Sequence, residues 1–264
     1  MKFSVLASGS KANSLLISSG DTRILVDCGL SARETTRRLG LLSVDPASLS
    51  GIVISHEHED HVAGVKVLAT NYQIPVFCSQ PTMLSSKHLR DISIHQIYFF
   101  DPGSPFTLGC LKIHPVQVSH DAVNAVAFRI SDAMSSMCIF SDLGEYTDDL
   151  VDFALDSDAL IIETNHEEES LWKSSYPWEV KHRIAGPLGH LSNNHASAFI
   201  HKLSRKDHDI GNRGLKIIGA AHVSEVSNTA DLALQAIVSG WGVKRINPHF
   251  FVGSAKETSE LYKI

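Results

Sequence analysis

Two alternating hydrophobic patterns run along most of the chain. Runs of β-branched and aliphatic residues bounded by glycine, serine or aspartate predict strands. In the first third these runs cover residues 3–8, 14–18, 22–29, 51–55 and 74–78. Apolar residues spaced three and four apart predict helices over residues 31–42, 61–72 and 81–90. This part of the chain is therefore expected to combine strands with helices.

The pattern changes between residues 94 and 141, where strand-like runs follow one another without helical spacing. They cover residues 95–100, 104–108, 110–119, 125–131 and 136–141. Alternation then returns. Helices are predicted over residues 148–155, 167–174, 193–206 and 226–242. Strands are predicted over residues 159–164, 215–221 and 250–254.

Two facing β-sheets with helices on their outer sides explain this order best. A long antiparallel block in the middle of a chain is hard to place in a doubly wound parallel sheet. The two halves also echo each other, because each has strands followed by helices. We therefore expect an α/β fold, a four-layer αβ/βα sandwich of two mixed sheets flanked by helices, with residues 1–264 forming a single domain.

Composition narrows the class of protein. No apolar run approaches the roughly 20 residues of a membrane span, and no signal-peptide pattern follows Met1. The four cysteines stand singly, which argues against a disulfide framework and a thiolate zinc site. We therefore expect a cytoplasmic protein without a membrane partner. The net charge of −6 argues against a broad nucleic-acid-binding coat, and 15 histidines are a weak hint of metal chemistry.

The segment GIVISHEHEDHVAG, residues 51–64, carries the strongest chemical signal. The buried strand should end at a sheet edge, where loops carry functional side chains. His56 and His58 are two positions apart and can project the same way, whereas Asp60 and His61 point elsewhere at the start of the next helix. This spacing suits two adjacent metal ions, one for each pair. The H-E-x-x-H zinc motif is excluded, because Asp60 is the fourth residue after His56.

HEHEDH resembles the H-x-H-x-D-H signature of the metallo-β-lactamase superfamily, whose fold is the αβ/βα sandwich. The resemblance implies three further ligands just after later strands, namely His120, Asp142 and His222. By similarity, His120 completes the ligands of the first ion, His222 completes those of the second, and Asp142 bridges both. His114 is a rival for His120, but it lies inside a predicted strand, where a half-buried face residue is the simpler interpretation.

The second half more narrowly resembles the phosphodiesterase branch that includes RNase Z. LIIETNHE with Glu163 and GPLGHLSNNHAS with His190 fall in the order of that branch's motifs. In such enzymes a Glu–His pair beside the metals passes a proton to the leaving oxygen, because a departing alkoxide has a high pKa. Asp27, at the end of ILVD, could orient a ligand imidazole, and a turn aspartate is the alternative interpretation.

Two absences narrow the resemblance further. The 22 residues from His120 to Asp142 leave no room for the tRNA-gripping arm of RNase Z enzymes, and the total length leaves none for a β-CASP insertion. ASGSKANSLLI, ILVDCGLSAR and GPLGHLSN resemble the bacterial YycJ/WalJ branch, and the likeness covers nearly the whole chain. This branch implies a metal-dependent DNA exonuclease or phosphodiesterase.

The expected function is a dinuclear metal-dependent phosphodiesterase acting on nucleic acid, with DNA favoured over RNA. The resemblance implies that a hydroxide bridging the ions attacks phosphorus, with Asp60, Glu163 and His190 serving catalysis. Zinc fits the ligands, and manganese or iron would fit nearly as well. The alternatives are a small-molecule metallohydrolase, for a cyclic phosphodiester, ester or lactone, and a non-catalytic or redox metalloprotein. The oligomeric state stays open.

Two predicted helices carry clusters of basic residues, which we interpret as solvated helix faces rather than phosphate tracks. The clusters are Arg33, Arg37 and Arg38 in one helix and Lys202, Arg205 and Lys206 in the other. The polar loop at residues 8–13 is interpreted as a hairpin turn, with backbone contacts to phosphate as the alternative.

Overall fold

The computed structural model describes residues 1–209, 214–242 and 247–264. By their contacts the residues form two compact units. Unit 1 contains Met1–Gln117, Ala122–Met134 and Ser254–Lys263, whereas unit 2 contains Val118–Asp121, Ser135–Gly253 and Ile264. Within the described ranges, no helix is long and apolar enough to cross a membrane.

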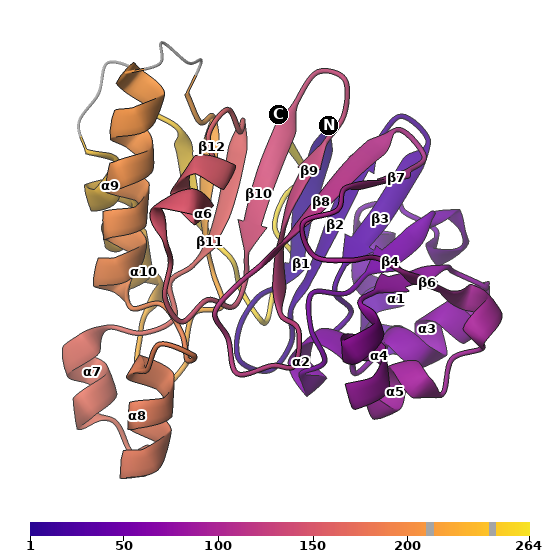
Figure 1. The fold of residues 1–264 in the computed structure, drawn as a ribbon, viewed down its shortest axis with the longest axis horizontal. Coiled ribbons are helices and arrows are strands. Elements are labelled where there is room, and N and C mark those ends of the chain that lie inside the picture. Colours follow the sequence, from indigo (N-terminus) through magenta and orange to yellow (C-terminus); the bar gives the residue numbers. More distant parts are fainter. Residues whose placement is uncertain (210–213, 243–246) are drawn as a thin grey trace. The chain divides into compact units, whose positions relative to one another are not determined.

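The first sheet lies in unit 1 and has seven strands (Figure 1). In spatial order they are β14 (Tyr262–Lys263), β1 (Lys2–Ala7), β2 (Ser14–Ser19), β3 (Thr22–Val26), β4 (Gly51–Val53), β5 (Val76–Cys78) and β6 (Ile97–Phe99). Pairing is antiparallel from β14 to β3 and parallel from β3 to β6. The parallel half brings the carboxyl ends of β3, β4 and β5 to one edge.

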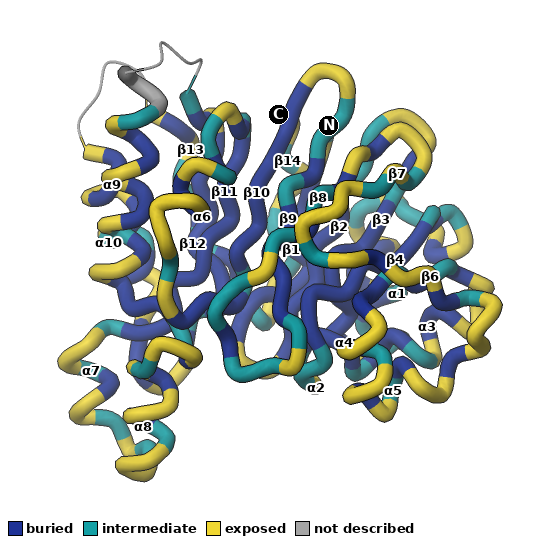
Figure 2. The backbone as a smooth tube through the Cα atoms, viewed as in Figure 1, coloured by how far each residue is buried: buried dark blue, intermediate teal, exposed yellow. Residues whose placement is uncertain are grey.

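The helices of unit 1 share a core with this sheet. They are α1 (Ala32–Leu41), α2 (Glu59–Val62), α3 (Val65–Tyr72), α4 (Gln80–Ser85) and α5 (Lys87–Arg90). Strand residues Leu25, Ile52 and Val76 belong to the same fully buried cluster as Leu39 of α1 and Leu68 of α3. Figure 2 shows the buried strands in dark blue, with exposed positions mostly on helix surfaces and turns. The apolar positions that predict these elements thus form the core.

The second sheet also has seven strands, β7 to β13. In unit 1, β7 (Phe106–Leu108), β8 (Leu111–Gln117) and β9 (Val126–Ser131) pair antiparallel. In unit 2, β10 (Ser136–Phe140), β11 (Ala159–Glu163), β12 (Ile217–Ala221) and β13 (His249–Val252) pair parallel. Two mixed sheets of seven strands, flanked by helices, confirm the architecture predicted from the sequence.

Unit 2 combines its parallel strands with helices. They are α6 (Asp148–Phe153), α7 (Glu168–Lys173), α8 (Trp178–Ala185), α9 (Asn193–Asp209) and α10 (Ala230–Trp241). α9 and α10 lie side by side, and α10 contacts β12 and β13 (Figure 1). Phe199 of α9 is fully buried with its ring centroid 5.3 Å from that of Phe140. This aromatic contact ties α9 to β10.

Several predicted boundaries are wrong for identifiable reasons. The segment predicted as one helix over 61–72 forms two helices, α2 and α3, which are separated at Ala63 and Gly64. Gly64 is required there because a Cβ atom would lie 2.0 Å from the Leu30 carbonyl oxygen. The helix predicted over 81–90 also divides, and Ser86 caps the second part with its hydroxyl.

The region predicted as strands from residue 94 begins with a 3₁₀ turn at Ile94–Gln96, and β6 then pairs parallel with β5. Helix α8 is absent from the prediction because it buries few residues, notably Lys181 and Ile184, and so has little apolar periodicity. The two-residue strand β14 is also too short to show a pattern.

Arg38 belongs to the core of unit 1 rather than to a basic surface. Its side chain donates to the carbonyl oxygens of Leu6 (2.6 Å), Ala255 (3.1 Å) and Lys256 (3.1 Å), and its Nε donates to Glu34 (2.7 Å). It is 5% exposed. This side chain therefore holds α1, β1 and the segment before β14 together.

We expect Arg38→Ala to lower the free energy of unfolding by about 2–4 kcal/mol, because it leaves buried carbonyl groups and Glu34 without a donor. Arg37→Ala is the matched control, since Arg37 pairs with the same Glu34 carboxylate from an exposed position. It should cost less than about 1 kcal/mol. Urea unfolding followed by circular dichroism measures both, and equal losses would contradict this role of Arg38.

Candidate functional site

The histidine-rich segment of unit 1 follows β4 and is fixed through its backbone. The amide of Asn13 donates to the Asp60 carbonyl oxygen at 2.8 Å, and the amide of Cys28 donates to that of His61 at 2.8 Å. A Cβ atom at Gly29 would lie 1.6 Å from the Asp60 oxygen. Glycine is therefore required at this position, and the close approach holds the turn against the end of β3.

A buried carboxylate orients the histidines of this segment. Asp27 Oδ2 lies 2.8 Å from His61 Nδ1, and Asp27 accepts hydrogen bonds from the Ser55 amide and hydroxyl, both at 2.8 Å. Ser55 Oγ lies 2.9 Å from His56 Nδ1. Asp27 is 2% exposed and has a φ of 61°. The rings of His56 and His61 are thus both held by their Nδ1 atoms.

The candidate ligand side chains of the segment lie in the two pairs expected from their spacing, His56 with His58 and Asp60 with His61. His56 Nε2 lies 3.1 Å from His58 Nδ1. His61 Nε2 lies 3.3 Å from Asp60 Oδ2. Asn13 donates to that Asp60 oxygen at 2.9 Å, and its amide nitrogen is 3.0 Å from His61 Nε2. Nitrogen and carboxylate oxygen donors at this spacing suit a divalent cation.

The two glutamates of the segment serve other contacts. Glu57 accepts a hydrogen bond from the Val123 amide at 2.7 Å. Glu59 is 2.9 Å from His88 Nε2 on α5. Both bonds tie the turn to its surroundings in unit 1.

A second group of candidate residues lies at the carboxyl ends of the parallel strands of unit 2. Glu163 is the last residue of β11 and pairs with Ala221, the residue before His222. Asp142 follows the end of β10, whose Phe140 pairs with Ile162. The parallel register therefore brings Asp142, Glu163 and His222 to one edge.

Glu163 is the centre of this group. Its Oε1 lies 2.7 Å from both His190 Nδ1 and His222 Nδ1. Its Oε2 accepts hydrogen bonds from the amides of Leu143 (2.8 Å) and Leu191 (3.2 Å). Glu163 is fully buried. Burial raises the pKa of this carboxyl. The charge of His190 and the hydrogen bonds from both histidines lower it by more than burial raises it, so the pKa lies below its usual value.

Asp142 joins the same cluster, with Oδ1 3.1 Å from His222 Nδ1 and 3.6 Å from His190 Nδ1. Asp142, Glu163, His190 and His222 lie close enough for their ligand atoms to hold a metal ion. His222 has a φ of 51°, a backbone conformation that is costly for a residue with a Cβ atom.

His120 approaches this edge from a short segment that is fixed by the loop after α8. Its Nδ1 lies 3.0 Å from the Gly189 carbonyl oxygen, and its Nε2 is 3.8 Å from Asp142 Oδ1. The Ser119 hydroxyl donates to Pro187 at 2.7 Å. The rival His114 lies within β8 in unit 1, where its Nε2 is 3.2 Å from the Gly103 carbonyl oxygen.

Four of the candidate ligands share one arrangement. Each has its Nδ1 beside a protein oxygen atom, which directs Nε2 as the ring nitrogen that can bind a cation. They are His56, His61, His120 and His222. Metal-binding histidines in proteins are typically held in this way. The donor set of each edge therefore fits a divalent metal ion.

Sequence reasoning missed several of these partners. Ser55 stands directly before His56 in the motif, and that position is the one signal that could have indicated it. For Asn13 the sequence indicates a turn loop with possible phosphate contacts, whereas its side chain forms hydrogen bonds with Asp60 and with the backbone of Gly9. The Gly189 carbonyl leaves no trace in the sequence pattern.

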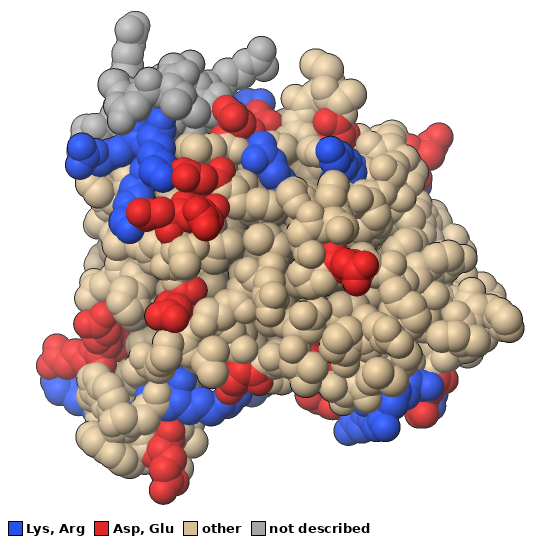
Figure 3. Space-filling model, viewed as in Figure 1, with Lys and Arg blue, Asp and Glu red and all other residues tan. Residues whose placement is uncertain are grey.

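Two lysines of α9 are paired with acidic residues of α6. Lys202 Nζ is 2.8 Å from Asp148, and Lys206 Nζ is 2.5 Å from Asp152 on α6. Figure 3 shows basic and acidic side chains next to each other over this part of the surface. This pairing agrees with the interpretation as a solvated helix face.

The Asp27→Asn variant should bind Zn²⁺ about 10–100-fold more weakly, because the amide nitrogen cannot accept the His61 Nδ1 proton. Asparagine fits the positive φ of this position, so the fold should persist. Asp45→Asn, at an exposed cap in unit 1, is the control and should leave the affinity unchanged. Competition against a chromophoric chelator measures the affinity, and wild-type binding by Asp27→Asn would show that the carboxylate does not orient a ligand.

Comparison with known proteins supports the fold and the resemblance. Residues 22–207 match the model of the beta-lactamase superfamily domain. The chain is 36% identical over 242 residues to the exodeoxyribonuclease WalJ of Streptococcus pneumoniae, covering 90% of this chain and 87% of that protein. It is 31% identical over 238 residues to the exodeoxyribonuclease YycJ of Bacillus anthracis, covering 90% and 88%.

Among solved structures, the metallo-beta-lactamase fold protein YhfI of Bacillus subtilis matches with a TM-score of 0.72 at 19% identity, covering 99% of both chains. The predicted metallo-β-lactamase fold and the likeness to the YycJ/WalJ branch are therefore confirmed.

Proposed function

The chain belongs to the beta-lactamase superfamily domain family, and we propose that it is a metal-dependent exodeoxyribonuclease that hydrolyses phosphodiester bonds of DNA. Two relatives named exodeoxyribonucleases match it over 90% of its length. Both units are proposed to act as one catalytic domain, since the family match spans residues of both. DNA is favoured over RNA by the names of these relatives.

The candidate ligands are proposed to bind two divalent ions. The first is assigned His56, His58 and His120, the second Asp60, His61 and His222, and Asp142 is shared. Their histidines are held through Nδ1 as metal ligands usually are. Two such ions, when bound, neutralise charge on the phosphate and make a water molecule more acidic. Zinc suits the nitrogen-rich set, with manganese and iron as alternatives.

His190 is proposed to give a proton to the leaving oxygen of the sugar. Its ring is 14% exposed, and its Nδ1 is held by Glu163 at 2.7 Å, so Nε2 is the nitrogen that can face a substrate. Glu163 stays ionised, because four donors surround its two oxygens. Its charge stabilises the protonated imidazole that gives up the proton. This pair, a buried Glu163 that holds a partly exposed His190, is the observation that best supports hydrolysis with a poor leaving group.

Substitution of one proposed ligand in each unit tests whether both units serve the same reaction. Asp60→Ala and His120→Ala should each reduce cleavage of labelled single-stranded DNA by about a thousandfold or more. The double variant should be little worse than either single variant, because groups that act as a unit are not additive. Glu59→Gln, in the same turn but paired with His88, should stay within about threefold of wild type.

Metal content measured on the same proteins should approach two ions per chain in the wild type and fall in both single variants. Retention of nuclease activity in Asp60→Ala would refute the proposal. If wild-type protein ignores DNA and bis(p-nitrophenyl) phosphate but turns over a lactone or thioester, the small-molecule hydrolase is the correct alternative.

Two substrates with different leaving groups test whether His190 transfers a proton or only maintains the structure of the site. His190→Ala should slow DNA cleavage by about 10²–10⁴-fold, since the sugar alkoxide needs a proton. On bis(p-nitrophenyl) phosphate, whose leaving group needs none, the loss should stay below about tenfold. His201→Ala, at an exposed position of α9, is the control. Equal losses on both substrates would indicate that His190 maintains the site rather than transferring a proton.

A further inference from the structure

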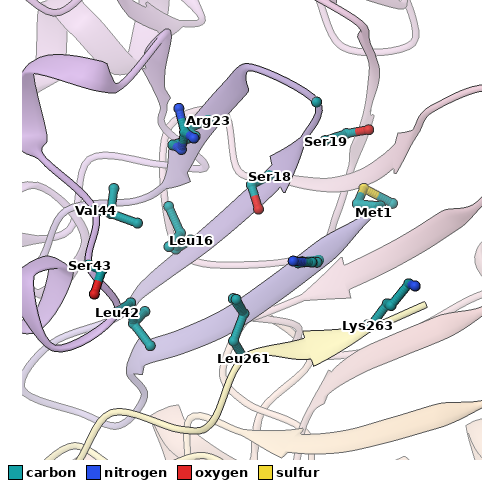
Figure 4. Close-up of a pocket in the computed structure, with 12 residues that line it drawn as sticks. Met1, Leu16, Ser18, Ser19, Arg23, Leu42, Ser43, Val44, Leu261 and Lys263 are labelled. Atoms are coloured by element: carbon teal, nitrogen blue, oxygen red, sulfur yellow. The ribbon is translucent and has the colours of Figure 1, made fainter.

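Unit 1 contains a pocket at the end of the first sheet where β3 begins. It has a volume of about 350 Å³ and is bounded by β14, β1, β2 and β3 and by the segment after α1 (Figure 4). Leu16, Leu42 and Val44 provide apolar walls, and Ser18 and Ser43 provide hydroxyl groups. β3 runs from this pocket to Asp27, a span of roughly 13 Å for four residues. The pocket is therefore distinct from the histidine-rich turn.

The sheet register concentrates positive charge in this pocket. Lys2 is paired with Lys263 on one side and with Ser18 on the other, and Ser18 is paired with Arg23. Directly paired residues project from the same face with their Cβ atoms about 4.5–5.5 Å apart. Three cationic side chains thus form one row across four strands, and all three line the pocket.

This row is electrostatically unfavourable in the protein alone. Like charges at directly paired positions destabilise a sheet. Among the residues that the structure describes, no carboxylate forms an ion pair with the side chain of Lys2, Arg23 or Lys263. Asp132, a carboxylate at the pocket wall, accepts a hydrogen bond from Ser19 at 2.7 Å and pairs with the amino group of Met1 at 3.3 Å. Other basic side chains of unit 1 do have an acidic partner, such as Lys66 with Asp91 and Arg38 with Glu34.

We propose that this pocket binds a phosphate group, carried either by a free nucleotide or by the backbone of a nucleic acid. The guanidinium of Arg23 can bind two phosphate oxygens at once, and Lys2 and Lys263 neutralise the remaining charge. Ser18 and Ser43 can donate to phosphate oxygens, and the apolar wall can contact a sugar or base. A volume of about 350 Å³ is within the usual range for small-ligand sites. The pocket is a second anion site and needs no nuclease activity.

Titration of thymidine 5′-monophosphate and of a labelled single-stranded DNA 12-mer tests the proposal. The variant Lys2→Gln/Arg23→Gln/Lys263→Gln should bind the mononucleotide at least tenfold more weakly than wild type if a free nucleotide occupies the pocket. If nucleic acid occupies it, the 12-mer should show that loss and a shallower dependence on salt. Either result supports a phosphate site and identifies the carrier.

The control removes the same number of charges from elsewhere on unit 1, as Lys66→Gln/Lys87→Gln/Lys112→Gln. It should change either affinity by less than threefold. All titrations are repeated in the Asp60→Ala background, where a nucleotide held at the histidine-rich turn would be affected but the pocket would not. Unchanged binding of both ligands in the pocket variant, or an equal loss in the control, would overturn the proposal. Hydrolysis of bis(p-nitrophenyl) phosphate by the pocket variant reports separately on the proposed active site.

Discussion

The contact between a buried carboxylate and an imidazole Nδ1 is the interaction on which both candidate edges depend. Burial of a carboxylate is costly unless hydrogen bonds and charges compensate for lost water. Asp27 accepts a hydrogen bond from the Ser55 amide, and Glu163 accepts hydrogen bonds from the amides of Leu143 and Leu191. Strand ends thus supply backbone donors that fix the carboxylates. The fixed carboxylates in turn select the tautomer and orientation of the histidines, which decides the nitrogen that is left for chemistry.

The backbone adopts unfavourable conformations at these carboxylate and histidine positions, which lowers the stability of the fold. Asp27 and His222 both have positive φ values, 61° and 51°, although neither is glycine. Such conformations are unfavourable and persist only where the surrounding structure requires them. The backbone is also closely packed at Gly29 and Gly189. A Cβ atom at these positions would lie 1.6 Å and 2.1 Å, respectively, from a carbonyl oxygen, so only glycine fits. Backbone strain and close packing therefore coincide at the segments that carry the candidate residues, which is typical of sites selected for function rather than stability.

The sequence could predict whatever depends on local spacing. HEHEDH places four side chains within one turn, and the strand-like runs at Asp142, Glu163 and His222 indicate that all three lie at or just after strand ends. Contacts between distant segments have no such signature. The Gly189 carbonyl reaches His120 across 69 residues, and β14 pairs with β1 from the other end of the chain. Periodicity shows that a segment is a strand, but it does not show its partner, so the row of Lys2, Arg23 and Lys263 becomes visible only with the register.

Charge explains how an acidic chain could act on a polyanion. Several of the basic side chains that cluster in the sequence are paired with acids in the structure, Lys202 and Lys206 with Asp148 and Asp152, and Arg38 with Glu34. They therefore contribute little field beyond their own partners. Among the residues that the structure describes, the row in the unit 1 pocket brings three cations without a paired acid to one place, and the metal ions proposed for the histidine-rich edges would add positive charge at those edges. The two proposals together imply binding by a few concentrated charges, which releases few counterions and depends on the placement of single phosphates rather than on a continuous basic track.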